Sequence, residues 1–137
     1  MTAEQPYPEG LKELEHTGFG AHDHHVMRVA RLRKHAMEMC RQYKVPQVRL
    51  IVRTPPGGGV AVYYETDRTI WLGPKRGKNL LTLAHEMAHH VVAMRHPRAR
   101  DHGPTWMRYY ADMVDDLKLM PRRAFLAAAR EYGVACR

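Results

Sequence analysis

The sequence predicts one α+β domain in which a small sheet of three strands packs on helices. Two observations predict this fold class. Apolar residues recur at the 3.6-residue spacing of an amphipathic helix in four segments, and three short segments between the first two of them alternate polar and apolar residues as strands do. The chain has 137 residues, enough for a single modest core. We expect an antiparallel-type sheet packed on the first two helices, followed by two C-terminal helices.

The domain is expected to follow a flexible N-terminal arm. Residues 1–20 contain two prolines, three glycines and few apolar side chains, a composition typical of irregular structure. We assign residues 1–20 to this arm, with one helical turn near Leu11–Leu14, and residues 21–137 to a single domain.

The first helix is predicted from Asp23 to Tyr43, and Pro46 prevents it from continuing. The preceding His22-Asp23-His24-His25 could form a second metal or substrate cluster, or the first helical turn with Asp23 near the N-cap. We favour the turn, because no ligand spacing stands out. Six residues are expected on the inner face of this helix: Val26, Val29, Ala30, Met37, Cys40 and Tyr43.

Three strands are predicted next, at residues 48–54, 60–65 and 69–72. The glycine-rich segment after Pro56 separates the first strand from the second, and a polar turn at residues 66–68 joins the second to the third. An edge strand of a sheet can pair with an extended peptide. The third strand, Thr69–Leu72, could serve in this way or be an ordinary member of the sheet.

Three more helices follow the strands. One is predicted from Asn79, a plausible N-cap, to Met94, because it carries an apolar stripe at helical spacing. A second runs from Pro104 to Leu117, and proline suits the first turn of a helix. The last runs from Pro121 to Tyr132. Three of its residues are expected to seal the core: Phe125, Leu126 and Ala129.

The second of the four predicted helices, residues 79–94, contains His85-Glu86-Met87-Ala88-His89, an H-E-x-x-H arrangement. Residues four apart on a helix advance about 400°, so His85 and His89 project from one face, one turn apart. Two imidazoles placed in this way can hold one Zn²⁺, and Glu86 can act as general base toward water at the metal. His90 points about 100° away and is not expected to be a ligand.

A catalytic zinc needs a third protein ligand, and His102 is the best candidate. Gly103 permits a sharp turn and Pro104 suits a helix start, which would fix His102 at the mouth of the next helix. His96 is one position away from the spacing that a third ligand would need, and we interpret it as a residue at the end of the helix. Three aspartates on the next helix could be acidic ligands or outer partners of the histidines: Asp112, Asp115 and Asp116. The only glutamate after His89 is Glu131, near the C-terminus.

The motif pair His85-Glu86-Met87-Ala88-His89 and His102-Gly103-Pro104-Thr105-Trp106 resembles the SprT-like zinc metallopeptidases, which include the Spartan proteases. The resemblance covers roughly Val26 to Asp116. It implies a zincin-like minimal metalloprotease domain with one Zn²⁺ on the three histidines, Glu86 as the catalytic carboxylate and Trp106 packed under the site. Many members carry a zinc ribbon with four cysteines, whereas this chain has only Cys40 and Cys136.

The chain carries a net charge of +8, which favours an anionic partner such as nucleic acid or simply gives a solvated surface. Since SprT-like proteases act on proteins bound to DNA, the resemblance favours nucleic acid. Two basic groups flank the motif in sequence and are candidate DNA contacts: Lys75, Arg76, Lys78, Arg95, Arg98 and Arg100. The sequence contains no apolar run long enough to span a membrane and no signal peptide, and its two cysteines are far apart. We expect a monomer in the reducing cytoplasm.

These observations predict hydrolysis of peptide bonds in DNA-associated proteins. Two alternatives stay open, a gluzincin-like regulatory protease with an acidic third ligand, and a non-catalytic nucleic-acid-binding module in which zinc is structural. Four tyrosines are candidate oxyanion donors or packing residues: Tyr63, Tyr64, Tyr109 and Tyr110.

Overall fold

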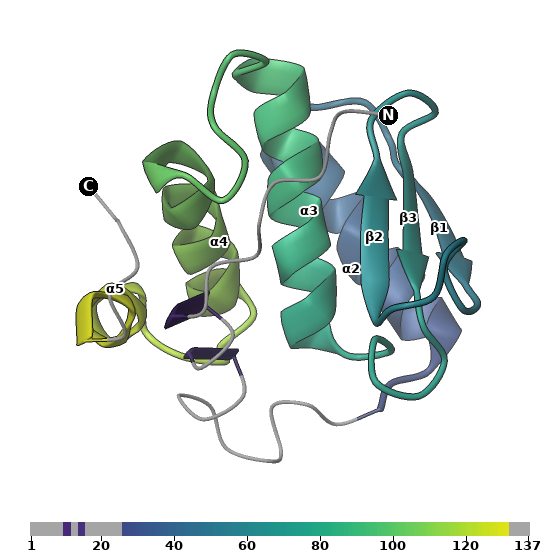
Figure 1. The fold of residues 1–137 in the computed structure, drawn as a ribbon, viewed down its shortest axis with the longest axis horizontal. Coiled ribbons are helices and arrows are strands. Elements are labelled where there is room, and N and C mark those ends of the chain that lie inside the picture. The colour runs from purple at the N-terminus through teal and green to yellow at the C-terminus, as the bar shows by residue number, and fades with distance from the viewer. Residues whose placement is uncertain (1–9, 12–13, 16–25, 132–137) are drawn as a thin grey trace.

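A computed structural model describes residues 10–11, 14–15 and 26–131 of the chain. Within these residues the fold is α+β, as predicted, and Figure 1 shows its arrangement. The elements in chain order are α2 (Val29–Gln42), β1 (Arg49–Val52), β2 (Ala61–Tyr64), β3 (Thr69–Leu72), α3 (Leu80–Arg95), α4 (Pro104–Asp116) and α5 (Arg122–Glu131). The cluster at residues 22–25 lies outside the described residues.

The sheet is mixed, so the prediction of an antiparallel-type sheet is wrong for one of its two strand pairs. The strand order is β1-β3-β2; β1 pairs with β3 in parallel, and β2 pairs with β3 antiparallel. The short turn after β2 makes the antiparallel pair, and it brings β3 back between the other two strands. This central place suits β3, whose Thr69, Ile70 and Leu72 are all buried. The expectation that β3 could be an edge strand is therefore wrong; the edge strand that contacts α3 is β2.

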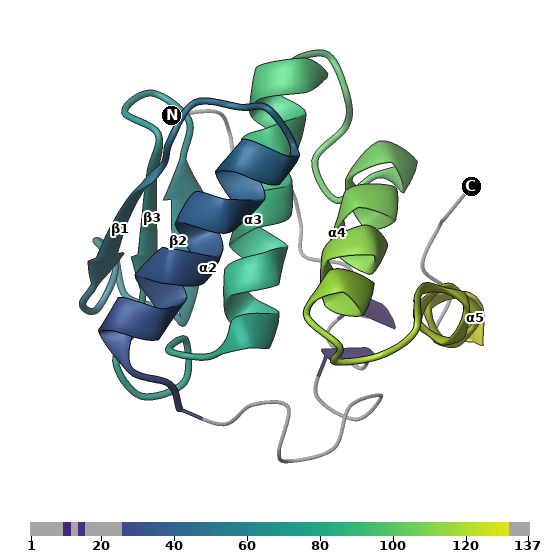
Figure 2. The same cartoon turned by 180° about the vertical axis from the view of Figure 1, so that it is seen from behind.

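The helices form successive layers beside the sheet. α3 contacts β2 and β3 on one side and α4 on the other, while α2 contacts both α3 and β1. Figures 1 and 2 show α2 behind α3, and α5 beyond α4 at the side remote from the sheet. α3 is therefore enclosed from several directions, which explains why its buried residues lie all around it and not along one stripe.

α2 begins later than predicted, and its inner face differs. Residues 26–28 are not helical, and the helix starts at Val29. Only Cys40 of the expected inner residues is fully buried; Val26 and Met37 are 51% and 39% exposed. The residues that α2 buries lie on the neighbouring face of the helix: Leu32, Ala36, Met39 and Cys40. Leucine and methionine there bury more apolar surface than the alanine and valine of the expected face, so burial favours this orientation.

The ends of α3 and α4 are set by local chemistry that the sequence predicted. Asn79 caps α3, since its side-chain oxygen accepts a hydrogen bond from the backbone N–H of Thr82 at 2.8 Å. α4 begins at Pro104, with Gly103 at the N-cap. In α5, Phe125 and Ala129 are buried and Leu126 packs against them, as expected for a helix that closes the core.

Candidate metal centre

The three histidines predicted as ligands come together between α3 and the start of α4. The Nε2 atom of His102 lies 3.0 Å from Nε2 of His89 and 3.2 Å from Nε2 of His85. One nitrogen of each ring lies within 4.8 Å of the others, and among the described residues this is the group that could hold a metal ion. His85 and His89 face the same way because they are one helical turn apart on α3.

The geometry fits a small tetrahedral cation. Zinc–nitrogen bonds of 2.0–2.1 Å at tetrahedral angles separate two imidazole nitrogens by about 3.3 Å. The observed separations of 3.0 and 3.2 Å are close to this value. Three imidazoles leave one tetrahedral position open, which is the arrangement of a catalytic site. The chemistry of the donor set suits zinc and also other divalent metals that imidazole binds.

Carboxylates hold the far nitrogens of the two helical histidines. Nδ1 of His85 lies 2.6 Å from Oε2 of Glu15, and Nδ1 of His89 lies 2.9 Å from Oδ1 of Asp101. A carboxylate can only accept, so the proton of each ring lies on Nδ1 and the lone pair lies on Nε2, toward the other histidines. Burial lowers the pKa of His85, but the Glu15 carboxylate outweighs it and raises the pKa overall.

His102 occupies a strained turn. Its φ of 55° is in the left-handed region, which is uncommon for residues other than glycine, although histidine adopts it more often than most. The turn is closed by the N–H of Gly103, which donates to the carbonyl of Arg100 at 3.1 Å, and a Cβ at Gly103 would lie 3.1 Å from Arg100 Cβ. Burial, together with the two neighbouring histidines, lowers the pKa of His102 to about 3. Its ring is therefore held neutral, the form that binds metals.

Glu86 supplies a buried carboxylate next to the histidines. It is 6% exposed, and its Oε1 lies 3.9 Å from Nε2 of His85. Its Oε2 is buried without a hydrogen-bond partner among the described residues. Burial raises the pKa of this carboxyl group. An uncompensated buried carboxylate is costly, so Glu86 is a group that fits a cation and a water at the site better than it fits a packed core.

Trp106 forms the floor of the site, as the sequence resemblance implied. Its ring centre lies 4.7 Å from the rings of His85 and His102 and 5.1 Å from that of His89. Its indole N–H donates to the backbone carbonyl of His85 at 3.3 Å. The indole thus holds all three imidazoles against α4 and keeps water from their apolar edges.

Other candidate ligands lie elsewhere. Asp112 pairs with Arg122, Asp116 accepts hydrogen bonds from Gln42 and Tyr43, and Asp115 is exposed. The carboxylates at Nδ1 of His85 and His89 are those of Glu15 and Asp101, not those of the aspartates of α4. That prediction is wrong because the partners come from the loop, as Asp101, and from the N-terminal region, as Glu15. Asp101 directly precedes His102, and this adjacency was a usable signal; Glu15 has no such signal, because 70 residues separate it from His85.

The remaining candidate histidines and tyrosines pair with each other. His96 ends α3 and contacts the hydroxyl of Tyr109 at 2.9 Å, and His90 contacts the hydroxyl of Tyr63 at 2.8 Å. The hydroxyl of Tyr110 donates to Glu15 at 2.6 Å. As predicted, neither His90 nor His96 joins the cluster. The hydroxyls of Tyr63, Tyr109 and Tyr110 are hydrogen-bonded to His90, His96 and Glu15, and not to the Nε2 atoms that converge at the site.

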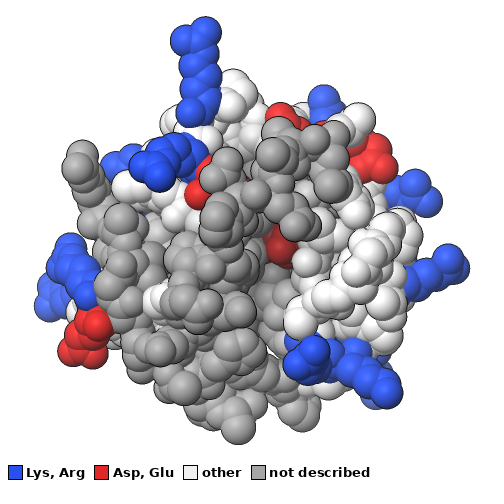
Figure 3. Space-filling model, viewed as in Figure 1, with Lys and Arg blue, Asp and Glu red and all other residues white. Residues whose placement is uncertain are grey.

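The two basic groups predicted as nucleic-acid contacts lie at opposite ends of α3. Lys75, Arg76 and Lys78 precede it, Arg95 is its last residue, and Arg98 and Arg100 lie in the loop that follows. All are exposed except the half-buried Lys78. A helix of this length separates the groups by about 24 Å at 1.5 Å per residue. Figure 3 shows the Lys and Arg side chains of one face at separate places around its edge. The six candidate contacts thus belong to two groups in the chain, one before α3 and one at and after its end, and their contact with nucleic acid stays a prediction.

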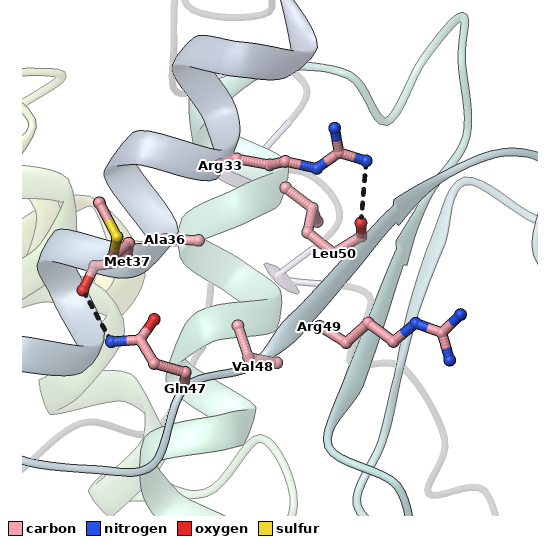
Figure 4. Close-up of a pocket in the computed structure, with 7 residues that line it drawn as sticks. All are labelled: Arg33, Ala36, Met37, Gln47, Val48, Arg49 and Leu50. Carbon is pink, nitrogen blue, oxygen red and sulfur yellow. Dashed lines mark hydrogen bonds between the residues drawn. The ribbon is translucent and has the colours of Figure 1, made fainter.

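A hollow of about 400 Å³ lies away from the histidines, between α2 and β1. Figure 4 shows its lining, in which Arg33 donates to the carbonyl of Leu50 at 3.5 Å and apolar atoms of Met37 and Val48 form the walls. No residue of α3 or α4 lines it. This hollow therefore does not extend the metal centre.

The chain matches no protein-family profile, no curated protein and no solved structure. Among the described residues, none of the helices combines the length and apolar character needed to cross a lipid bilayer.

Proposed function

We propose that this chain is a zinc-dependent endopeptidase of the zincin type. The observation that carries the proposal is the convergence of three Nε2 atoms, at 3.0 and 3.2 Å, beside a buried carboxylate oxygen that has no hydrogen-bond partner among the described residues. The resemblance of the two motifs to SprT-like peptidases supports the same conclusion.

His85, His89 and His102 would hold the ion. When bound by three protein ligands, zinc supplies Lewis-acid activation of water and of a carbonyl group. Glu86 accepts a proton from the attacking water on its Oε2 and then delivers it to the leaving amine. A raised carboxyl pKa favours both steps, because a group that titrates nearer to neutral pH both takes and gives a proton readily. Trp106 and the outer carboxylates keep the three rings in place meanwhile.

For the substrate, we propose proteins associated with nucleic acid. The net charge of +8 and the motif resemblance support this substrate class. The exposed cations at either end of α3 could contact a polyanion on both sides of the site. Cleavage of a basic DNA-binding protein, and of the chain itself, should therefore increase when single-stranded DNA is added.

The two alternative functions explain fewer of the residues at the site. A protease with an acidic third ligand needs a carboxylate in the ligand group, and that group consists of three histidines among the described residues. A purely structural zinc normally has four protein ligands and has no use for Glu86. Zinc retained at full stoichiometry in a His102→Ala variant would favour the first alternative.

The experiment that tests the proposal compares zinc-loaded wild type with Glu86→Gln, using a basic DNA-binding protein with and without single-stranded DNA. General acid–base catalysis contributes about 10²–10⁴-fold, so turnover should fall by about that factor while one zinc per chain is kept. Glu38→Gln is the matched control, because Glu38 is an exposed residue of α2. Equal turnover in wild type and Glu86→Gln, or no cleavage by the zinc-loaded wild type, would contradict the proposal.

A further inference from the structure

Glu15 links the N-terminal region to the metal centre. Its Oε2 lies 2.6 Å from Nδ1 of His85 on α3 and accepts a hydrogen bond of 2.6 Å from the hydroxyl of Tyr110 on α4. One carboxylate oxygen thus joins the two helices that carry the site. Charge-assisted hydrogen bonds of this length are among the strong ones in proteins.

The residues beside Glu15 explain how its carboxylate reaches the site. Leu11 and Leu14 are helical and fully buried, and the side chain of Glu15 is only 13% exposed. Positions 11, 14 and 15 have the spacing of one helical face, so the side chains of the two leucines and the glutamate all point toward the interior of the protein. We call Gly10, Leu11, Leu14 and Glu15 the N-terminal segment. Its apolar contacts hold it, and they place the carboxylate against His85.

The carboxylate of Glu15 faces the metal centre. Burial of a carboxylate is costly unless a positive charge or strong donors compensate it. Among the described residues His85 forms an ion pair with Glu15, and His85 together with His89 and His102 forms the group that could hold a cation. The N-terminal segment therefore fits best when the metal position carries positive charge.

We propose that the N-terminal segment is part of the metal centre, that Glu15 positions His85 for the metal, and that zinc binding and docking of this segment stabilise each other. This inference rests on the proposed metal site. Glu15 keeps the proton on Nδ1 and the lone pair on Nε2. A cation at Nε2 polarises the ring and strengthens the Nδ1–H bond to Glu15. Coupling between two binding events is reciprocal. If docking of the segment raises the affinity for zinc by some factor, zinc raises the equilibrium constant for docking by the same factor.

Asp101 provides an internal comparison. It holds His89 in the same way, but its side chain is 41% exposed against 13% for Glu15, and its bond is longer at 2.9 Å. Solvent screens the Asp101 pair more strongly. Glu15→Gln should therefore weaken zinc binding more than Asp101→Asn, although both changes replace one outer carboxylate by an amide.

The first test measures zinc affinity by competition with a chelator. Loss of an outer partner of a metal-bound histidine typically costs about 10–100-fold in affinity, which we expect for Glu15→Gln. Tyr110→Phe removes one hydrogen bond to Glu15 and should cost about 2- to 10-fold. Glu38→Gln should change nothing. If Glu15→Gln fails to fold, Tyr110→Phe still tests the inference.

The second test measures docking directly. Lys12 offers a trypsin site next to Leu11. Zinc should slow cleavage after Lys12 at least about tenfold in wild type, the reciprocal of the affinity effect, and much less in Glu15→Gln. Each protein is compared with itself, with and without zinc, so a change in overall stability cancels. A merely structural role for Glu15 would leave this zinc-dependent factor unchanged.

The outcomes separate this inference from the proposed function. Tight zinc binding by wild type, with equal affinity in Glu15→Gln or cleavage after Lys12 that zinc does not slow, would overturn the inference and leave the peptidase proposal standing. Zinc-dependent protection in a protein that cleaves no substrate would support the inference and count against the peptidase. Failure of wild type to bind zinc would overturn both.

Discussion

The buried histidines on the two sides of α3 have different hydrogen-bond partners. On the side that faces α4, His85 is held at Nδ1 by the Glu15 carboxylate, and its Nε2 points at another imidazole. On the side that faces the sheet, His90 is fully buried, with Nδ1 2.8 Å from the hydroxyl of Tyr63 and Nε2 2.7 Å from the carbonyl of Pro46. The carbonyl can only accept, so Nε2 of His90 carries the proton and Nδ1 accepts from Tyr63.

The difference shows what makes a histidine available to a metal. Both nitrogens of His90 are used within the protein, by neutral partners, and no lone pair is left for a ligand bond. His85 and His89 each have a carboxylate at Nδ1, while Nε2 points toward the other histidines of the group. Histidines of one helix thus divide into ligands and structural residues according to the partner at each nitrogen.

The largest expected effect is at His102. His102→Ala removes a ligand of the first coordination sphere, so zinc affinity should fall by more than the roughly 100-fold that loss of an outer partner can cost. The chelator competition assay measures it. His96→Ala is the matched control, since His96 belongs to the same connection but contacts Tyr109. Unchanged zinc affinity in His102→Ala would break the distinction between ligand and structural histidines.

His90→Ala should instead lower stability and keep zinc. The change leaves a cavity and removes the partners of Tyr63 and Pro46, which together should cost about 3 kcal/mol in free energy of unfolding. Denaturant unfolding measures this cost, with His35→Ala, on the half-buried edge of α2, as the control. Loss of zinc from folded His90→Ala would mean that the sheet side of α3 also serves the metal.

The pH dependence of stability should separate the two sides further. Burial, aided by Arg68, keeps the pKa of His90 below its ordinary value of 6.5, while the bond to Pro46 partly offsets this. As pH falls through about 6.5, His90 therefore takes up a proton in the unfolded chain but stays neutral in the folded chain. The stability due to His90 is fully present above about pH 6.5 and is lost as pH falls toward the folded-state pKa, by at most about 1.4 kcal/mol per pH unit.

The measurement compares metal-free wild type with His90→Gln, whose amide can still donate to Pro46 but does not titrate. The stability advantage of wild type over the variant should shrink as pH falls below about 6.5. A difference that stays constant between pH 7.5 and 5.5 would show that His90 is not held neutral by the fold.

The smallest effect is expected at Tyr63. Tyr63→Phe removes one hydrogen bond to Nδ1 of His90, which should cost about 1 kcal/mol in free energy of unfolding without changing zinc affinity. Tyr64→Phe is a neighbouring control, because Tyr64 is the next residue of β2 and is half-buried like Tyr63. Weaker zinc binding in Tyr63→Phe would show that the two sides of α3 are coupled.

The features that the sequence predicted well are those with a local cause. The spacing of His85 and His89 follows from the helical repeat, and the start of α4 follows from Gly103 and Pro104. The N-cap of α3 at Asn79 is another such case. These features depend on residues within one or two turns, so a single sequence suffices to infer them.

The features that were missed depend on distant partners. β3 lies between β1 and β2 because it buries more apolar surface than either edge strand. The three strands have four residues each, and their polar and apolar patterns are too similar to show from sequence which strand is most buried. The inner face of α2 was misplaced because both candidate faces carry apolar residues. Glu15 lies in the predicted N-terminal arm, and nothing near it in sequence indicates that it contacts His85.

The central claim is that the side of α3 facing α4 is a three-histidine metal centre with one open position. X-ray absorption spectroscopy at the zinc edge of the zinc-loaded protein tests this claim most directly. We expect one zinc with three imidazole nitrogens and one oxygen neighbour, all at about 2.0–2.1 Å. A sulfur neighbour at about 2.3 Å, or a shell closed by four protein ligands, would contradict it.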